Sequence, residues 1–147
     1  MEKFTALLFS ILLTTSLNLN AQSTVQVNTT GEEQVHSVST PGYGHFEITL
    51  DSDYLLVEGQ FSDLRGTYSS AQIFHGSSGE DGNQLFQLTI DLDEDYLAGE
   101  VHADENRFEL SEGIKEALSS GMLYINISTS RYERGELRGQ IPAMDLE

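Results

Sequence analysis

A single histidine marks the point where an alternating, strand-like segment runs into a loop of glycine and acidic residues. The segment reads AQIFHGSSGEDG, and the histidine is His75. Neutral imidazole is a common ligand of zinc and copper, which proteins hold tightly with three or four converging ligands. The other histidines, His36, His45 and His102, lie on other segments. The sequence favours a strand-end histidine that hydrogen-bonds to the loop, and leaves a zinc or copper site around His75 as the alternative.

The acidic run DLDEDYLAGEVHADE contains part of the pattern of a calcium-binding loop. Asp91, Asp93 and Asp95 have alternate spacing, and calcium prefers several oxygen ligands that converge on a turn. The pattern is incomplete, because Tyr96 stands where such a loop needs glycine and His102 stands where it needs glutamate. The run therefore favours a solvated hairpin tip or strand edge whose charges deter edge-to-edge pairing, with a calcium site as the alternative.

Basic residues are scarce, and they cluster near the C-terminus. Arg131, Tyr132 and Arg134 form a candidate binding patch for an anionic partner, either a protein or a component of the cell envelope. The alternative, which the sequence favours, is that Arg138 pairs with acidic residues across the sheet while Arg131 and Arg134 are solvated in a loop.

The sequence contains no motif that identifies a catalytic centre. It has no G-x-S-x-G nucleophile elbow, no phosphate-binding glycine loop and no zinc-protease helix motif. The absence of cysteine excludes disulfides, thiolate zinc sites and cysteine nucleophiles. The 24 acidic residues leave a paired-carboxylate glycosidase open, but no spacing selects a pair. We therefore expect a non-enzymatic protein with no catalytic residues and no cofactor.

Charge and the N-terminal segment restrict the partners and the location. A net charge of −17 repels nucleic acid phosphates and anionic lipid headgroups, so we expect neither as a partner. The first 21 residues combine a short charged start, an uncharged apolar stretch too short to span a bilayer, and Ala21 at the expected cleavage point. We expect a cleaved signal peptide at residues 1–21 and an exported protein, periplasmic or secreted, that does not insert into the membrane after cleavage.

The remaining residues predict one domain of antiparallel strands. Five segments alternate apolar and polar residues, which is the pattern of strands with one buried face. Their predicted core residues are Phe46, Ile48, Leu50, Leu55, Val57, Phe61, Phe86, Leu88, Ile90, Leu123, Ile125, Ile127, Leu137 and Ile141. On the last segment we expect Glu136, Arg138 and Gln140 to face solvent.

One segment has helical spacing instead. In LSEGIKEALSSGM, Ser111 is the predicted N-cap and Gly121 the predicted stop of a short helix. The pattern as a whole predicts an all-β fold, an antiparallel β-sandwich or a partly open barrel with one short helix. We expect a flexible lead-in at residues 22–34, the β-sandwich domain at residues 35–143 and a C-terminal tail at residues 144–147.

The segment GMLYINISTSRYERGELRGQI resembles the closing signature of CHRD domains, the module named after chordin. That signature runs as L-Y-V-N-hydrophobic-H-T, a loop, and G-G-E-I-R-G-Q-hydrophobic. Upstream, SSAQIFHG resembles the A-H-I-H-G strand of the family, and the resemblance extends over residues 35–141. It implies a compact β-sandwich of the immunoglobulin or copper-zinc superoxide dismutase type, extracellular protein contacts and no established activity.

The resemblance also bears on His75. Many family members carry two histidines on one face of the A-H-I-H-G strand and a third in the N-hydrophobic-H-T segment, a set that would suit zinc or copper. Here Ser128 replaces the third histidine. Pleat alternation with a bulge near Phe74 replaces the first by Gln72, whereas alignment of the His-Gly ends replaces it by Ile73. Either register leaves His75 alone.

These observations favour an exported, non-enzymatic β-sandwich module with a binding or structural role at the cell envelope or outside the cell. The alternative is a metal-binding protein that holds zinc or copper through His75 and other ligands, or calcium at the acidic loops.

Overall fold

The computed structural model describes residues 22–146, which form ten strands and one helix. The strands are β1 (Ser23–Thr29), β2 (Tyr43–Asp51), β3 (Tyr54–Ser62), β4 (Tyr68–His75), β5 (Asn83–Gln87), β6 (Asp91–Leu92), β7 (Gly99–Val101), β8 (Arg107–Glu109), β9 (Leu123–Thr129) and β10 (Leu137–Ile141), with α1 (Glu112–Ser119) between β8 and β9. The expected signal peptide lies outside the described residues. Within them, no helix is long and apolar enough to cross a membrane.

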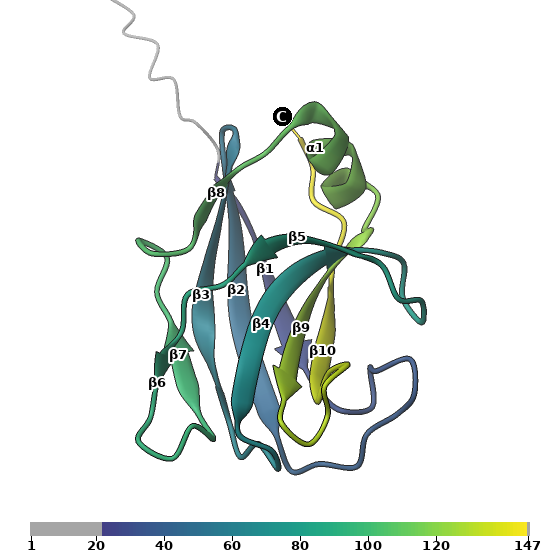
Figure 1. The fold of residues 1–147 in the computed structure, drawn as a ribbon. Coiled ribbons are helices and arrows are strands. Elements are labelled where there is room, and N and C mark those ends of the chain that lie inside the picture. The colour runs from purple at the N-terminus through teal and green to yellow at the C-terminus, as the bar shows by residue number, and fades with distance from the viewer. Residues whose placement is uncertain (1–21, 147) are drawn as a thin grey trace, which may run out of the picture.

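The strands pair into two antiparallel sheets that form two layers (Figure 1). In the first sheet the order is β1-β2-β3-β7-β6, and β8 also pairs with β3. In the second sheet the order is β10-β9-β4-β5. The apolar faces of both sheets supply the core, and neither sheet closes on itself. This arrangement confirms the predicted antiparallel β-sandwich with one short helix.

The hairpin of β2 and β3 shows how alternation builds the core. Ile48 faces Val57 across the two strands, and both side chains are fully buried. Burying such a side chain stabilises the fold by roughly 1.5–3 kcal/mol. Only glycine fits at position 59, because a Cβ there would collide with the carbonyl oxygen of His45. The predicted core residues of this hairpin are all buried: Phe46, Ile48, Leu50, Leu55, Val57 and Phe61.

Strand β9 is buried on both faces, which its alternation does not predict. Leu123, Ile125 and Ile127 are fully buried as expected, but the residues between them are buried as well. Glu136 and Arg138, beside β9, are 0% and 2% exposed, so the expectation that they face solvent is wrong. The reason is that loops from distant parts of the chain cover this face.

Helix α1 closes one end of the sandwich (Figure 1). The hydroxyl of Ser111 accepts a hydrogen bond from the backbone N–H of Ile114, which caps the first turn. Gly121 adopts a positive φ of 69°, and the N–H of Met122 donates to the carbonyl of Ala117. This geometry ends the helix. The predicted helix, its cap and its stop are confirmed.

Both ends of the domain are more ordered than the sequence suggests. Residues 22–34 do not form the expected flexible lead-in, because β1 pairs with β2 along its whole length, from Ser23 opposite Leu50 to Thr29 opposite Gly44. At the other end, Met144 is 2% exposed and its N–H donates to the carbonyl of a helix residue. Residue 144 therefore belongs to the core rather than to a tail.

Candidate functional site

Glu136, directly before β10, and the alternate residues Arg138 and Gln140 of β10 hold loops over the outer face of the second sheet. Glu136 is fully buried. Its carboxylate accepts four hydrogen bonds of 2.8–3.1 Å, from the hydroxyls of Thr40 and Thr129 and from the backbone N–H groups of Arg65 and Gly66. These donors replace the water that a buried carboxylate loses. Glu136 therefore ties two distant loops to the start of β10.

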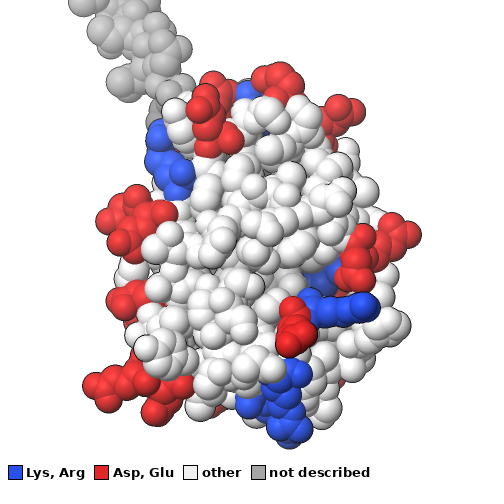
Figure 2. Space-filling model, viewed as in Figure 1, with Lys and Arg blue, Asp and Glu red and all other residues white. Residues whose placement is uncertain are grey.

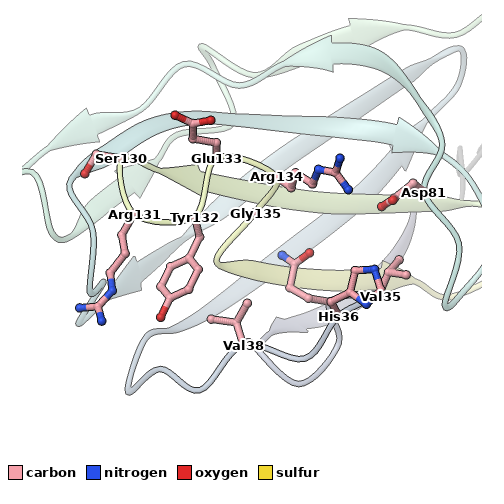
Figure 3. Close-up of a pocket in the computed structure, with 11 residues that line it drawn as sticks. Val35, His36, Val38, Asp81, Ser130, Arg131, Tyr132, Glu133, Arg134 and Gly135 are labelled. Carbon is pink, nitrogen blue, oxygen red and sulfur yellow. The ribbon is translucent and has the colours of Figure 1, made fainter.

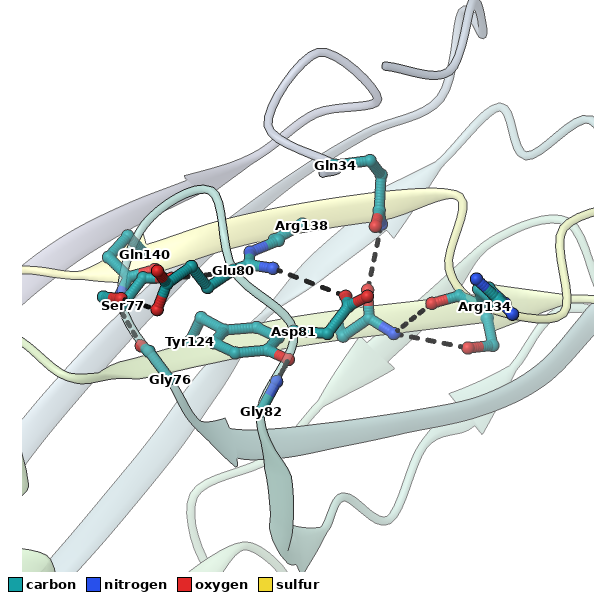
Figure 4. Close-up of polar contacts among 12 residues, drawn as sticks. Gln34, Gly76, Ser77, Glu80, Asp81, Gly82, Tyr124, Arg134, Arg138 and Gln140 are labelled. Atoms are coloured by element: carbon teal, nitrogen blue, oxygen red, sulfur yellow. Dashed lines mark hydrogen bonds and ion pairs between the residues drawn. The ribbon is translucent and has the colours of Figure 1, made fainter. Parts of the chain in front are cut away.

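Arg138 fastens the loop of residues 76–82. Its guanidinium carbon lies 3.6 Å from the centroid of the Tyr124 ring. One guanidinium nitrogen donates to the carbonyl of Ser77 at 2.9 Å, and the other lies 4.0 Å from the carboxylate of Asp81 (Figure 4). The Tyr124 hydroxyl accepts a hydrogen bond from the N–H of Gly82 at 3.0 Å. The loop is thus held at both ends, and Arg138 does not pair with acids across the sheet as expected.

Gln140 holds the same loop and the end of the helix. Its side-chain amide donates to the carbonyls of Gly76 and Gly121, both at 2.9 Å (Figure 4). The conspicuous G-E-L-R-G-Q motif therefore stabilises the fold by anchoring loops. The side chains of Glu136 and Arg138 and the side-chain nitrogen of Gln140 are bonded within the molecule, whereas the buried Oε1 of Gln140 has no hydrogen-bond partner among the described residues.

Asn126 on β9 joins two further segments. Its side-chain oxygen accepts from the amide of Gln34 at 2.9 Å, and its side-chain nitrogen donates to the carbonyl of Arg134 at 3.0 Å (Figure 4). Gly135 follows with a φ of 137°, and a Cβ there would collide with the Asn126 side chain. Segment 31–38 and the turn of residues 130–135 are therefore held next to each other.

Between these two segments lies a hollow of about 390 Å³ (Figure 3). It is lined by Gln34, Val35, His36, Val38, Asp81, Ser130, Arg131, Tyr132, Glu133, Arg134 and Gly135. A second hollow of about 320 Å³ lies over the outer face of β4 and β9, and is lined by Ser70, Gln72, Phe74, Asp81, Gly82, Tyr124, Asn126, Ser128, Glu133 and Arg134. The two share Asp81, Glu133 and Arg134, so we call them together the outer cleft.

The outer cleft is lined by two arginines, two acids and several apolar side chains. The guanidinium of Arg134 has no hydrogen bond or ion pair with residues 22–146, and Arg131 lies 5.8 Å from the Tyr132 ring centroid. Val38 lies near the Tyr132 ring, and Val35 lines the hollow farther along, beside His36 (Figure 3). On the face shown in Figure 2, blue side chains lie mainly at the lower right, with red ones among them, and red side chains occupy most of the remaining edge.

The sequence identified only part of this cleft. Arg131, Tyr132 and Arg134 all line the first hollow, and their role in binding a partner remains a prediction. The structure adds the segment around Val35 and His36, which carries no periodicity or motif that could have revealed its role. Arg138, the third arginine of this stretch, lies beneath the loops instead.

The two groups with displaced pKa values lie outside the outer cleft. Burial raises the pKa of Tyr68, against the smaller effect of a hydrogen bond with the backbone of Ala71. The pKa of Lys115 is raised by its hydrogen bonds to Asp53 and Glu112. Both pKa displacements have structural causes. Tyr68 is packed against the ring of Phe61, and Lys115 forms ion pairs with Asp53 and Glu112.

The register of β4 decides the position of His75. Strand β4 runs regularly against β9 from Ala71 to His75. The irregularity opposite Ile73 and Phe74 lies in β5, where Leu85 is the extra residue. His75 therefore alternates with Ile73 on the core-side face, and the interpretation that places Gln72 and His75 on one face is wrong.

His75 therefore shares a face with Ile73, the residue that replaces the first histidine of the family strand. It is separated from Ser128, which replaces the third histidine, because Ser128 lines the outer cleft and His75 does not. Within residues 22–146, the His75 ring forms no hydrogen bond and joins no group of three metal-ligating side chains, so the expected bond to the loop is not found.

The acidic run forms a hairpin tip. The carboxylate of Asp93 accepts hydrogen bonds from the backbone N–H groups of Leu97 (2.9 Å) and Ala98 (3.2 Å), between β6 and β7. Tyr96 adopts a positive φ of 58° in this turn. Asp93 therefore shapes the turn, and it is not brought together with Asp95 in a ligand group among the described residues.

Asp91 lies in a different group, which the sequence did not predict. The ligand atoms of Asp91, Glu100 and His102 lie within 4.8 Å of one another, and all three side chains are exposed. Asp91 and Glu100 face each other across β6 and β7. The Nε2 of His102 lies 3.7 Å from a carboxylate oxygen of Glu100 and 3.8 Å from a carboxylate oxygen of Asp91. The cross-strand register, invisible in the sequence, brings them together.

Comparison with known proteins agrees with the fold. The family model of the CHRD domain matches residues 25–141, which span all strands from β2 to β10 and most of β1. No curated protein and no solved structure matches the chain. The match includes the loop-anchoring residues of β9 and β10. The chain belongs to the CHRD domain family.

Proposed function

We propose that this protein is an exported, non-enzymatic binding module that holds an anionic partner in the outer cleft, at the cell envelope or outside the cell. The guanidinium of Arg134 carries the proposal, because it lies between the two hollows without a partner among the described residues. An arginine in that position can form a bidentate contact with a carboxylate, a geometry that lysine does not match.

Most other basic side chains are occupied. Lys115 pairs with Asp53 and Glu112, Arg138 is buried against Tyr124, and Arg107 lies over another tyrosine ring. Arg65 belongs to the loop whose Gly66 packs against Arg131, at the same end of the molecule as the outer cleft. An anionic partner therefore meets available positive charge mainly at this end.

Export and the lack of catalysis rest on the sequence. The apolar stretch within the first 21 residues supports export, and the absence of the common catalytic motifs supports a non-enzymatic role. The outer cleft adds an open surface with mixed apolar and cationic walls, which suits binding.

A matched pair of charge reversals tests the proposal. Fluorescence anisotropy at low ionic strength would measure binding of labelled octaglutamate and tetragalacturonate to the wild type, Arg134→Glu and Arg107→Glu. Both variants change the net charge equally, but Arg107 lies on β8, away from the outer cleft. We expect Arg134→Glu to weaken binding of at least one probe about tenfold, equivalent to about 1.4 kcal/mol, and Arg107→Glu to weaken it far less. No binding of either probe, or equal weakening by both variants, would overturn the proposal.

A further inference from the structure

We infer that the partner is an acidic peptide segment in which a carboxylate side chain lies next to a branched aliphatic one. This inference rests on the proposed function and names the chemistry that the outer cleft selects. Each part of such a segment has a counterpart on the walls described above.

The first hollow provides the apolar contact. Val35 and Val38 contribute branched aliphatic side chains, and Tyr132 contributes an aromatic ring (Figure 3). A sugar chain has no aliphatic side chain to place there, whereas a leucine, isoleucine or valine of a peptide does. Burial of such a side chain gives favourable binding free energy in proportion to the apolar area that it covers.

The border between the hollows provides the carboxylate contact. The free guanidinium of Arg134 lies there, and Arg131 adds a second cation near Tyr132. Two acids, Asp81 and Glu133, also line this border. Asp81 is 4.0 Å from the buried guanidinium of Arg138, and Glu133 points away from the side on which Tyr132 lies (Figure 3). A carboxylate therefore finds positive charge beside the apolar wall.

The second hollow provides neutral polar groups for a peptide backbone. Ser70 and Gln72 from β4 and Ser128 from β9 line it. Hydroxyl and amide groups both donate and accept hydrogen bonds, as backbone amides do. The adjoining hollows thus allow an extended segment to place its side chains in one and its backbone against the other.

The Tyr124 ring of the second hollow favours a peptide over a polyuronate. The Tyr124 ring is stacked with Phe74, with centroids 5.2 Å apart, and Arg138 also lies over it. Its faces are therefore occupied and do not offer the open platform on which a sugar ring stacks. The net charge of −17 repels an acidic partner from the rest of the surface, which confines it to this end of the molecule.

Three capped dipeptides measure the apolar contact and the carboxylate contact separately. Isothermal titration calorimetry would compare N-acetyl-Leu-Glu-amide with N-acetyl-Leu-Gln-amide, which lacks the charge, and with N-acetyl-Gly-Glu-amide, which lacks the aliphatic side chain. Tetragalacturonate serves as the sugar probe. The variants are Arg134→Gln and Val38→Ser, and native amide NMR spectra confirm that both remain folded.

We expect the wild type to bind the Leu-Glu probe about fivefold more tightly than either comparison peptide. Arg134→Gln should abolish the preference over Leu-Gln and keep the preference over Gly-Glu, and Val38→Ser should do the opposite. Tetragalacturonate binding without a response to the Leu-Glu probe would overturn this inference and leave the proposed function standing. No binding of any probe, octaglutamate included, would overturn both. Equal binding of the three dipeptides would also overturn the inference.

Discussion

The guanidinium carbon of Arg138 lies 3.6 Å from the centroid of the Tyr124 ring, in the interior of the covered outer face. Arg138 lies on β10 and Tyr124 on β9, and the loop of residues 76–82 closes over both. Arg138, the arginine of the family signature, therefore holds the loop of residues 76–82 in place. Its charge supports the position of Asp81 at the border of the outer cleft.

Replacing this arginine by lysine should destabilise the protein. Arg138→Lys keeps the charge but loses the planar contact with Tyr124 and the aligned hydrogen bond to Ser77, so the free energy of unfolding should fall by about 1–3 kcal/mol. Urea unfolding followed by circular dichroism measures this change. Arg107→Lys, at an exposed stacking contact with Tyr54, is the control, with an expected loss of under about 1 kcal/mol. Equal losses in the two variants would contradict the proposed role of Arg138.

Neutralising Glu136 should have a comparable effect. Glu136→Gln places an amide where four donors converge, so the free energy of unfolding should fall by about 2–4 kcal/mol. The control is Glu47→Gln, because Glu47 accepts one exposed hydrogen bond from Gln26 and its change should stay within about 0.5 kcal/mol. If Glu136→Gln unfolded at the same urea concentration as the wild type, the loops would not depend on this carboxylate.

A methyl group at Gly135 should damage the outer cleft. Gly135→Ala forces a Cβ onto the side chains of Asn126 and Gln34, which hold the two walls together. We expect octaglutamate binding to weaken by about tenfold and the stability to fall by at least about 1 kcal/mol. Gly113→Ala, on the helix surface with open space around its Cβ, should instead raise the stability by about 0.5–1 kcal/mol and leave binding unchanged. Unchanged binding in Gly135→Ala would show that the turn is not part of the site.

Alkaline pH should destabilise the protein through Tyr68. Burial raises the pKa of this tyrosine above its ordinary value of 10.0. The folded state then holds the phenol proton more tightly than the unfolded state, so its contribution is complete below about pH 10 and is lost as pH rises through the folded-state pKa. Tyr68→Phe should therefore lose less stability than the wild type between about pH 9 and pH 11. Parallel pH profiles of the melting temperature would contradict this assignment.

The purified protein should carry little metal after dialysis. Asp91, Glu100 and His102 are all exposed, and Asp93 is occupied by backbone N–H groups. Three exposed ligands hold a divalent ion weakly, so we expect substoichiometric zinc, copper and calcium by elemental analysis. Stoichiometric metal that His102→Ala removes and His75→Ala retains would instead identify a metal site on the β6–β7 hairpin.

Local patterns predicted most of the core, although Phe86 and Ile90 are only partly buried, and tertiary contacts determined the rest. Ile48 and Val57 could be assigned because alternation reports a buried strand face, and the helix could be bounded because Ser111 and Gly121 act on their own neighbours. The burial of Glu136 could not be predicted, because three of its hydrogen-bond donors belong to residues 40, 65 and 66, far away in the sequence. Strand β1 was missed because its few valines lie among polar residues.

The candidate site divides in the same way. Arg131, Tyr132 and Arg134 stood out as a scarce charge cluster, and their turn does form one wall of the outer cleft. The opposite wall could not be predicted, since the contact between Gln34 and Asn126 that positions it joins residues far apart in the chain. The position of His75 depended on whether the extra residue lay in β4 or β5, which the sequence left open.

The binding site in the outer cleft is tested most directly by mapping the amide NMR shifts of the labelled protein as unlabelled octaglutamate is added. We predict that the largest changes fall in residues 34–38 and 130–135, with smaller changes along β4 and none in the hairpin of residues 91–102. Changes spread evenly over the surface, or an undisturbed spectrum at saturating probe, would contradict a binding site in the outer cleft.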